Sequence, residues 1–172
     1  MKFMRLLLVL ALAVPVFAAD EMKKLDFLVG EWKGEAWWQM GGPNAKREYA
    51  LQHEKVTPRA GGNVLLVEGI GRTKKEDGTA GDIVHDALAF LRWDDAAKQY
   101  RFSTAVAGRG TAEPTFEVTG PNKAVWSMDL PQGKMRYTIS LTEKGEWFEV
   151  GEYSRDGEKW SKFLEMTLVK VK

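Results

Sequence analysis

The chain has 172 residues, of which 44% are hydrophobic and 28% charged, with a formal net charge of +1 and no cysteine. This length and hydrophobic share predict one domain with a sizeable core and argue against disorder. The missing cysteine excludes a disulfide framework, a Cys-ligated metal site and a thiol nucleophile, and the balanced charge gives no basic face for a nucleic-acid partner.

The N-terminus has the pattern of a secretory signal peptide. Residues 1–18 combine a basic start, an apolar run over residues 6–17 and the small residue Ala18. The run is too short to span a bilayer as a helix, and the acidic residue Asp20 disfavours the alternative of a buried N-terminal helix. We expect cleavage after Ala18 and a single domain over residues 19–172 in the periplasm or outside the cell, with no transmembrane segment and no lipid-modified cysteine.

After a short helical turn predicted over residues 21–28, the chain alternates apolar and polar residues in short stretches separated by Gly, Pro, Asn and Asp. This rhythm is typical of antiparallel β proteins, and we predict an all-β, antiparallel up-and-down barrel of about ten strands. The predicted strands span residues 32–40, 47–57, 63–73, 85–93, 99–106, 115–119, 124–130, 134–141, 146–154 and 160–171. The charged side chains expected on the outer face, Glu149 among them, exclude an outer-membrane barrel, whose outer face is apolar.

Two of the early strands contain residues that should point into the barrel. In the first, alternation places Trp32, Ala36 and Trp38 on one face. In the fourth, His85 shares its face with Ala87, whose small side chain would leave space beside it. The alternative for His85 is a position at the end of a strand, bonded to a loop carbonyl or to water.

The inner face of the late strands is predicted from the register that tight turns impose. A two-residue turn at residues 144–145 pairs Tyr137 with Glu152 and places Phe148 on the same face. A buried carboxyl group must be hydrogen-bonded or have a raised pKa. Glu152 is therefore either a structural partner of Tyr137, a polar anchor for a ligand or a general base.

The last strand has two alternative facings. The hairpin before it carries Phe163 and Glu165 to the inner face. A bulge would instead turn Leu164 and Met166 inward, and the sequence leaves this choice open.

Residues 27–34, Phe-Leu-Val-Gly-Glu-Trp-Lys-Gly, resemble the Gly-x-Trp-x-Gly start of the first strand in lipocalin-like calycin barrels. Residues that look similar to nitrobindin and to secreted bacterial lipocalin-like domains of unknown function also include 66–71, 84–88, 151–154 and 163–168. The resemblance implies a calycin fold in which Trp32 plugs one end of the barrel under a basic side chain.

Nitrobindin binds haem through a histidine on its late strands, so the resemblance raises the question of a haem site. The last two predicted strands, residues 146–154 and 160–171, contain no histidine. Haem on another axial ligand such as Tyr137 is the weaker alternative, and we predict no cofactor and no metal.

These features predict a barrel that binds a small, mostly apolar or amphipathic molecule in its interior without catalysis. The residues expected to line the interior are Trp32, Trp38, His85, Tyr137, Phe148, Glu152 and Phe163. Two alternatives stay open: an enzyme that uses Glu152 or His85 as a general acid or base, and a filled barrel that acts as a structural or interaction module. The sequence does not predict the oligomeric state.

Overall fold

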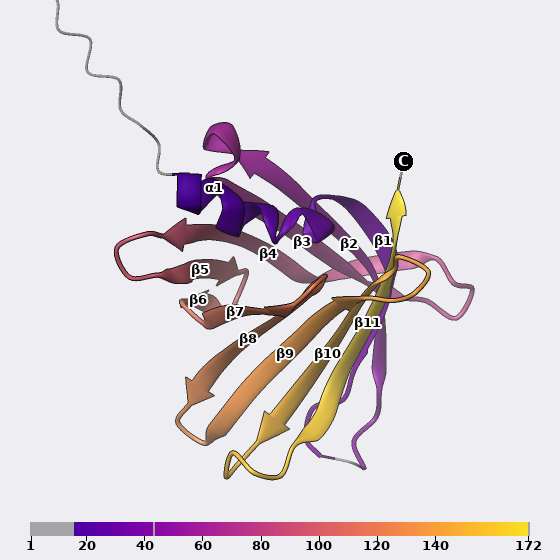
Figure 1. Cartoon of the computed structure of the whole chain (residues 1–172). Coiled ribbons are helices and arrows are strands. Elements are labelled where there is room, and N and C mark those ends of the chain that lie inside the picture. The colour runs from indigo at the N-terminus through magenta and orange to yellow at the C-terminus, as the bar shows by residue number, and fades with distance from the viewer. Residues whose placement is uncertain (1–15, 43, 172) are drawn as a thin grey trace, which may run out of the picture.

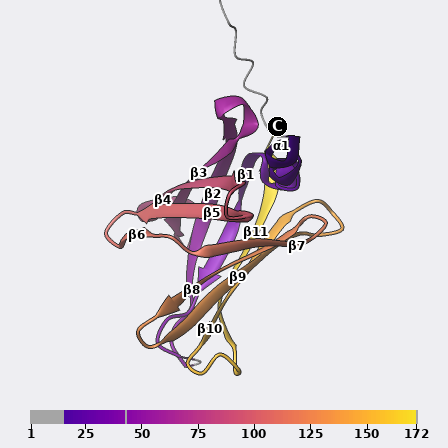
Figure 2. The same cartoon turned by 60° about the vertical axis from the view of Figure 1, so that its left-hand side comes forward.

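The alternating stretches form one antiparallel sheet of eleven strands in the computed structural model, which describes residues 16–42 and 44–171. The strands are β1 (Gly30–Trp38), β2 (Glu48–Arg59), β3 (Val64–Lys74), β4 (Ala80–Asp94), β5 (Gln99–Val106), β6 (Gly110–Ala112), β7 (Thr115–Gly120), β8 (Lys123–Leu130), β9 (Gly133–Leu141), β10 (Trp147–Ser154) and β11 (Ser161–Val171). Their order in the sheet is β6-β5-β4-β3-β2-β1-β11-β10-β9-β8-β7. Each strand therefore pairs with a neighbour in sequence except at β1 and β11, which join the two ends of the meander, and the sheet curls into a barrel-like shape (Figures 1 and 2).

The all-β class is confirmed, with one strand more than predicted. The additional strand β6 has three residues, too few for alternation to indicate a strand. β6 pairs only with the end of β5, and β7 pairs only with β8. Within the described ranges no ladder joins β5 to β7, and aromatic rings close this seam instead: Phe116 lies 5.6 Å, centroid to centroid, from both Tyr100 and Phe102.

Two short helices cover one end of the curled sheet (Figure 1), and they include the segment predicted as a helical turn. They are α1 (Val16–Lys23) and η1 (Asp26–Leu28); a third, η2 (Ala60–Gly62), links β2 to β3. Leu25 and Leu28 are buried against the sheet. Most of the predicted signal peptide, residues 1–15, lies outside the described residues.

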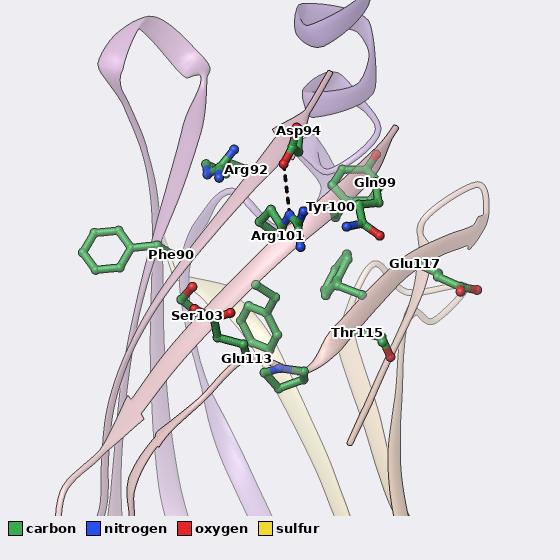
Figure 3. A pocket seen from close by; sticks show the side chains of 13 residues that line it. Phe90, Arg92, Asp94, Gln99, Tyr100, Arg101, Ser103, Glu113, Thr115 and Glu117 are labelled. Atoms are coloured by element: carbon green, nitrogen blue, oxygen red, sulfur yellow. Dashed lines mark hydrogen bonds and ion pairs between the residues drawn. The ribbon is translucent and has the colours of Figure 1, made fainter. Parts of the chain in front are cut away.

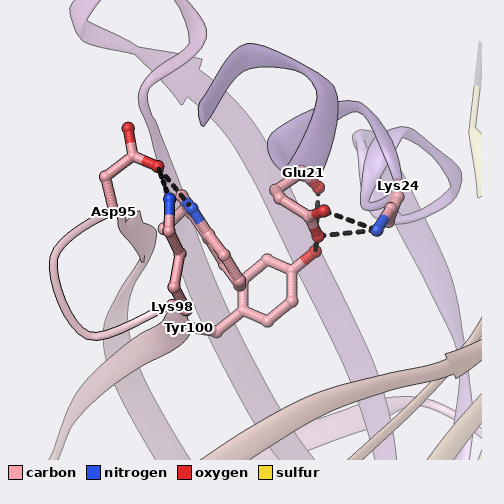
Figure 4. Close-up of polar contacts among 6 residues, drawn as sticks. Glu21, Lys24, Asp95, Lys98 and Tyr100 are labelled. Atoms are coloured by element: carbon pink, nitrogen blue, oxygen red, sulfur yellow. Dashed lines mark hydrogen bonds and ion pairs between the residues drawn. The ribbon is translucent and has the colours of Figure 1, made fainter. Parts of the chain in front are cut away.

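A polar contact fixes α1 to the sheet (Figure 4). The Tyr100 hydroxyl donates to the Glu21 backbone carbonyl at 2.8 Å, and Lys24 Nζ lies 2.7 Å from the Glu21 carboxylate. Burial is the main cause of a raised pKa of Tyr100, so the hydroxyl stays a donor. The contact therefore holds the helical segment over the closed end of the sheet.

Removing this hydroxyl should loosen the helical segment. Tyr100→Phe is expected to lower the free energy of unfolding by about 1 kcal/mol, the usual net contribution of one hydrogen bond. Thermal unfolding gives the change, and hydrogen exchange of residues 20–25 shows where protection is lost. Tyr49→Phe, at a position with 49% of its surface exposed, is the matched control; equal effects of both changes would contradict the assignment.

The close approach of β1 and β11 explains why a glycine, Gly34, follows Trp32 on the same face of β1. A Cβ on Gly34 would overlap the Thr167 carbonyl oxygen and lie 2.9 Å from the Leu168 Cα, so β1 and β11 approach too closely for any other residue. Trp32 packs edge-on against Trp147 with 5.8 Å between the ring centroids. Lys170 Nζ lies 5.0 Å from the Trp32 ring centroid, so a basic group covers this ring.

The register between β9 and β10 corrects the predicted facing of Phe148 and Glu152. The loop between these strands has three residues, 143–145, because Thr142 N donates to the Glu146 carbonyl, and Gly145 adopts φ +75°. This is a common hairpin geometry, one residue longer than the predicted turn. A one-residue slip inverts a whole strand.

The slip exchanges the two faces of β10. Tyr137 pairs with Gly151, and Glu152 pairs with Arg136 instead. Trp147 and Glu149 point inward, whereas Phe148 and Glu152 point outward. The predictions that Phe148 and Glu152 line the interior and that Glu149 faces water are therefore wrong.

The bulge considered for the last strand is present. Leu164 pairs with Gly151 and Lys162 with Glu152, which leaves Phe163 as the extra residue. Met166 and Leu164 lie on the inner side, and Glu165 is held outside by Lys162 Nζ at 2.7 Å. Because of the bulge, Phe163 is buried as well.

Candidate functional site

A polar group on β2 lies inside the curled sheet, where apolar residues are the rule. Gln52 and Glu54 are each 7% exposed, and Gln52 Nε2 donates to Glu54 Oε1 at 2.6 Å. Both side chains lean over glycines of β3. A Cβ on Gly69 would lie 2.7 Å from both Glu54 carboxylate oxygens, and one on Gly71 would overlap Gln52 Oε1. The glycine pair of β3 therefore makes room for this amide and carboxyl group.

A second carboxyl group reaches the interior from β10. Glu149 is 8% exposed and accepts from the indole Nε1 of Trp147 at 3.1 Å and of Trp126 at 3.4 Å. Two indole donors from different strands fix its position. We call Glu54 and Glu149, whose strands β2 and β10 flank the β1–β11 pair in the strand order, the interior acid pair.

Burial perturbs the protonation of both members of the interior acid pair. Burial raises the pKa of Glu54 to about 8, and the charge of Glu149 adds to the shift while the Gln52 amide opposes it. Burial raises the pKa of Glu149 to about 7 against the opposing effect of the two indole donors. Near neutral pH the pair therefore retains about one proton or more.

The site has more acceptor atoms than donors. Across the part of the chain that the structure describes, no donor contacts Gln52 Oε1 or Glu54 Oε2. Buried polar atoms in folded proteins are nearly always hydrogen-bonded. The residual exposure of these inward side chains indicates that a small space adjoins them.

Aromatic rings lie on the Glu149 side of the interior acid pair. Trp126 and Tyr137 are stacked with 3.8 Å between centroids and 6° between planes, and Phe163 meets Tyr137 edge-on at 5.6 Å. Trp126 and Tyr137 are only partly buried although they point inward. Burial and the Glu149 charge raise the pKa of Tyr137, so its hydroxyl remains protonated.

The open end of the curled sheet, opposite α1, carries basic groups. His85 points inward beside Ala87, as predicted, and burial together with the charge of Arg109 lowers its pKa. The charge of Arg109 also opposes the raised pKa of Tyr137. His85 is therefore neutral at physiological pH.

The predicted site residues do not form one cluster in the structure. Tyr137 and Phe163 border the interior acid pair, and His85 lies toward the open end. Trp38 is inward and partly exposed. Trp32 plugs the closed end, with its Nε1 donating to the Leu28 carbonyl at 2.8 Å. The outward Phe148 and Glu152 do not join them.

The interior acid pair was missed by sequence reasoning for two reasons. Glu149 was missed because the predicted register of β10 was wrong by one residue, which placed its side chain on the outer face. Gln52 and Glu54 lie between Ala50 and Val56 at period-two spacing, and both of these apolar residues are buried. That alternation was a usable signal for an inward polar pair.

A separate hollow of about 430 Å³ lies at the seam (Figure 3). Its lining includes the inward rings of Tyr100 and Phe116 and the outward Phe90 and Arg101. Arg101 Nε is already paired with Asp94 Oδ2 at 3.0 Å. The hollow follows from the missing ladder between β5 and β7, and the interior acid pair is not part of its lining.

No family model matches this chain, and no curated protein matches it either. The crystal structure of Rv2717c from M. tuberculosis is similar in fold, with a TM-score of 0.61 and 15% sequence identity over 88% of this chain and 97% of that one. This likeness shows a shared fold alone. Among the described residues, no helix is both long and apolar enough to cross a bilayer.

Proposed function

We propose that this protein is a secreted or periplasmic calycin-type barrel that binds a small, mostly apolar molecule in its interior without catalysis. The observation that carries the proposal is that, in the described part of the chain, no protein donor contacts Gln52 Oε1 or Glu54 Oε2, although both side chains point into the interior. A bound molecule would donate hydrogen bonds to these oxygens, and these bonds would hold it in place. The aromatic rings on the Glu149 side of the acid pair would supply the contact area.

The cost of this arrangement to the fold supports a binding role. Buried carboxyl groups usually stabilise a protein less than apolar residues of similar volume, and glycines such as Gly69 and Gly71 weaken a strand. An interior without a ligand would be more stable with aliphatic residues in place of the two buried glutamates and the two glycines. The combination of two unfavourable features at one place is typical of a functional site.

Secretion agrees with the docking of the N-terminal segment. Cleavage after Ala18 would leave the residues that contact the sheet, Glu21, Met22 and Leu25, in the mature chain. The mature domain would then keep its closed end covered.

The binding proposal is tested with N-phenylnaphthylamine, an apolar probe that fluoresces when bound. Ala87 pairs with Gly69, over which Glu54 leans, so Ala87→Phe would place a ring next to Glu54 and should weaken probe binding by roughly tenfold or more. Leu88→Phe, the adjacent outward position with 40% exposure, is the matched control and should bind like the wild type. Thermal unfolding verifies that both variants fold.

Native mass spectrometry of the secreted protein complements the titration. A co-purifying small molecule on a chain that starts at Ala19 would support both interior binding and signal cleavage. A wild type that carries no such mass and binds no probe would contradict the proposal and favour a filled interior.

Acid–base catalysis is the second candidate, because a carboxyl group with a pKa of about 7, such as Glu149, is well matched to proton transfer at neutral pH. Incubating the released molecule with fresh protein distinguishes binding from catalysis. A binding protein returns it unchanged, whereas an enzyme alters its mass.

A further inference from the structure

The hydrogen-bonding inventory of the interior specifies what its ligand must donate. The protein donors at the site are the Gln52 amide and the indoles of Trp126 and Trp147, and each already contacts a carboxylate oxygen. Gln52, more than nine-tenths buried, also turns an amide oxygen without a donor toward the interior. Apart from the proton that the acid pair retains near neutral pH, the described residues of the site supply no free donor and no cation acts on the pair, so the site has no need of further acceptors.

We propose that the interior acid pair receives the ammonium group of a hydrophobic amine. This inference rests on the proposed interior binding and names the class of ligand. A primary ammonium carries three donors and no acceptor, so it complements a site whose oxygens without a protein donor are Glu54 Oε2 and Gln52 Oε1 and whose second carboxyl group is Glu149. Charge-assisted hydrogen bonds of this kind are the strong ones.

Other ligand chemistries fit the site less well. A carboxylate would meet two acidic groups, and a hydroxyl would satisfy one acceptor only. The basic groups that might attract an anion do not act on the pair: Lys170 covers Trp32 at the closed end, and Arg109 acts on His85 and Tyr137 but on neither Glu54 nor Glu149. The apolar part of the amine would lie toward Phe163 and the partly exposed rings.

Binding of an amine should release protons. The groups that face the pair from the surrounding strands are Tyr137 and the two carboxyl groups themselves, with His85 and Arg109 farther toward the open end. Burial keeps the empty pair partly protonated at neutral pH. The ammonium needs carboxylate partners, so each proton lost from the pair passes to solvent as the cation binds, and affinity should rise with pH.

The test compares three probes of one chain length, octylamine, octanol and octanoate, by calorimetry at about pH 6, 7 and 8. Octylamine should bind most tightly, and its affinity should rise by up to about tenfold per pH unit for each proton released. Titrations in buffers of different ionisation enthalpy count those protons. Glu149→Gln and Glu54→Gln should weaken octylamine by roughly tenfold or more while leaving octanol unchanged.

Glu152→Gln, on the outer face of the same strand as Glu149, is the matched control and should bind octylamine like the wild type. Thermal unfolding shows whether each variant is folded. Binding of octanol or octanoate at least as tight as that of octylamine would overturn the inference and leave the proposed function standing. If the wild type binds none of the three octyl compounds and does not bind the apolar probe, the proposed function itself is overturned.

Discussion

Replacing Gly34 by alanine is expected to lower the free energy of unfolding by about 3 kcal/mol or more, at the upper end of the cost of overpacking. The new Cβ would overlap the Thr167 carbonyl oxygen and crowd the Leu168 Cα, and backbone atoms cannot move aside as a flexible side chain can. β1 and β11 would have to separate at the pairing that joins the two ends of the meander. Chemical denaturation measures the loss directly.

Gly120→Ala is the matched control for this change. Gly120 also lies in a strand, its φ is not positive, and nothing lies within 4 Å of a Cβ placed there. The control should be neutral or slightly stabilising, because alanine lowers the entropy of the unfolded chain. Similar losses in the two variants would show that close approach of β1 and β11 is not the reason for Gly34.

Replacing Glu54 by glutamine is expected to stabilise the protein increasingly as pH rises. The pKa of Glu54 is about 8 in the folded chain against a model value of 4.5, so the folded state keeps its proton where the unfolded state has lost it. Stability from this group is complete below pH 4.5 and is lost as pH rises toward about 8. Between about pH 5 and 8 the wild type should lose about 3 kcal/mol through Glu54.

The variant should escape this loss because an amide does not ionise. Its midpoint of thermal unfolding, relative to the wild type, should rise by roughly 6–12 °C between about pH 5 and 8. Glu152→Gln should keep the pH dependence of the wild type, since Glu152 lies outside and is paired with Arg136 at 2.8 Å. A constant difference between Glu54→Gln and wild type across this range would mean that Glu54 is ionised in the folded protein.

The early strands were predictable because alternation alone decides their facing. Trp32, Ala36 and Trp38 share one face by period two, and His85 and Ala87 do so on their own strand. No partner strand is needed for these assignments. The interior positions of β1 and β4 therefore followed from the sequence.

The late strands were less predictable because their facing was transferred from one strand to the next through turns. The turn before β9 consists of Pro131 and Gln132; a turn of Gln132 and Gly133 would shift the pairing by two residues and keep the same inward face. The three-residue loop before β10 moved the pairing by one residue and inverted the strand. Loop length is set by tertiary packing as much as by the turn residues themselves.

The sequence by itself determined the all-β class, the helical turn before β1, and the inward tryptophans of β1, because each depends on local periodicity or on residue size. Only the tertiary structure decided which glutamates are interior. Glu54 and Glu149 lie 95 positions apart in the sequence, and their shared environment exists only because β2 and β10 curl toward each other around the glycines of β3 and the indoles of Trp126 and Trp147. Burial and mutual charge, which set the chemistry of these carboxyl groups, are properties of that arrangement and of no single segment.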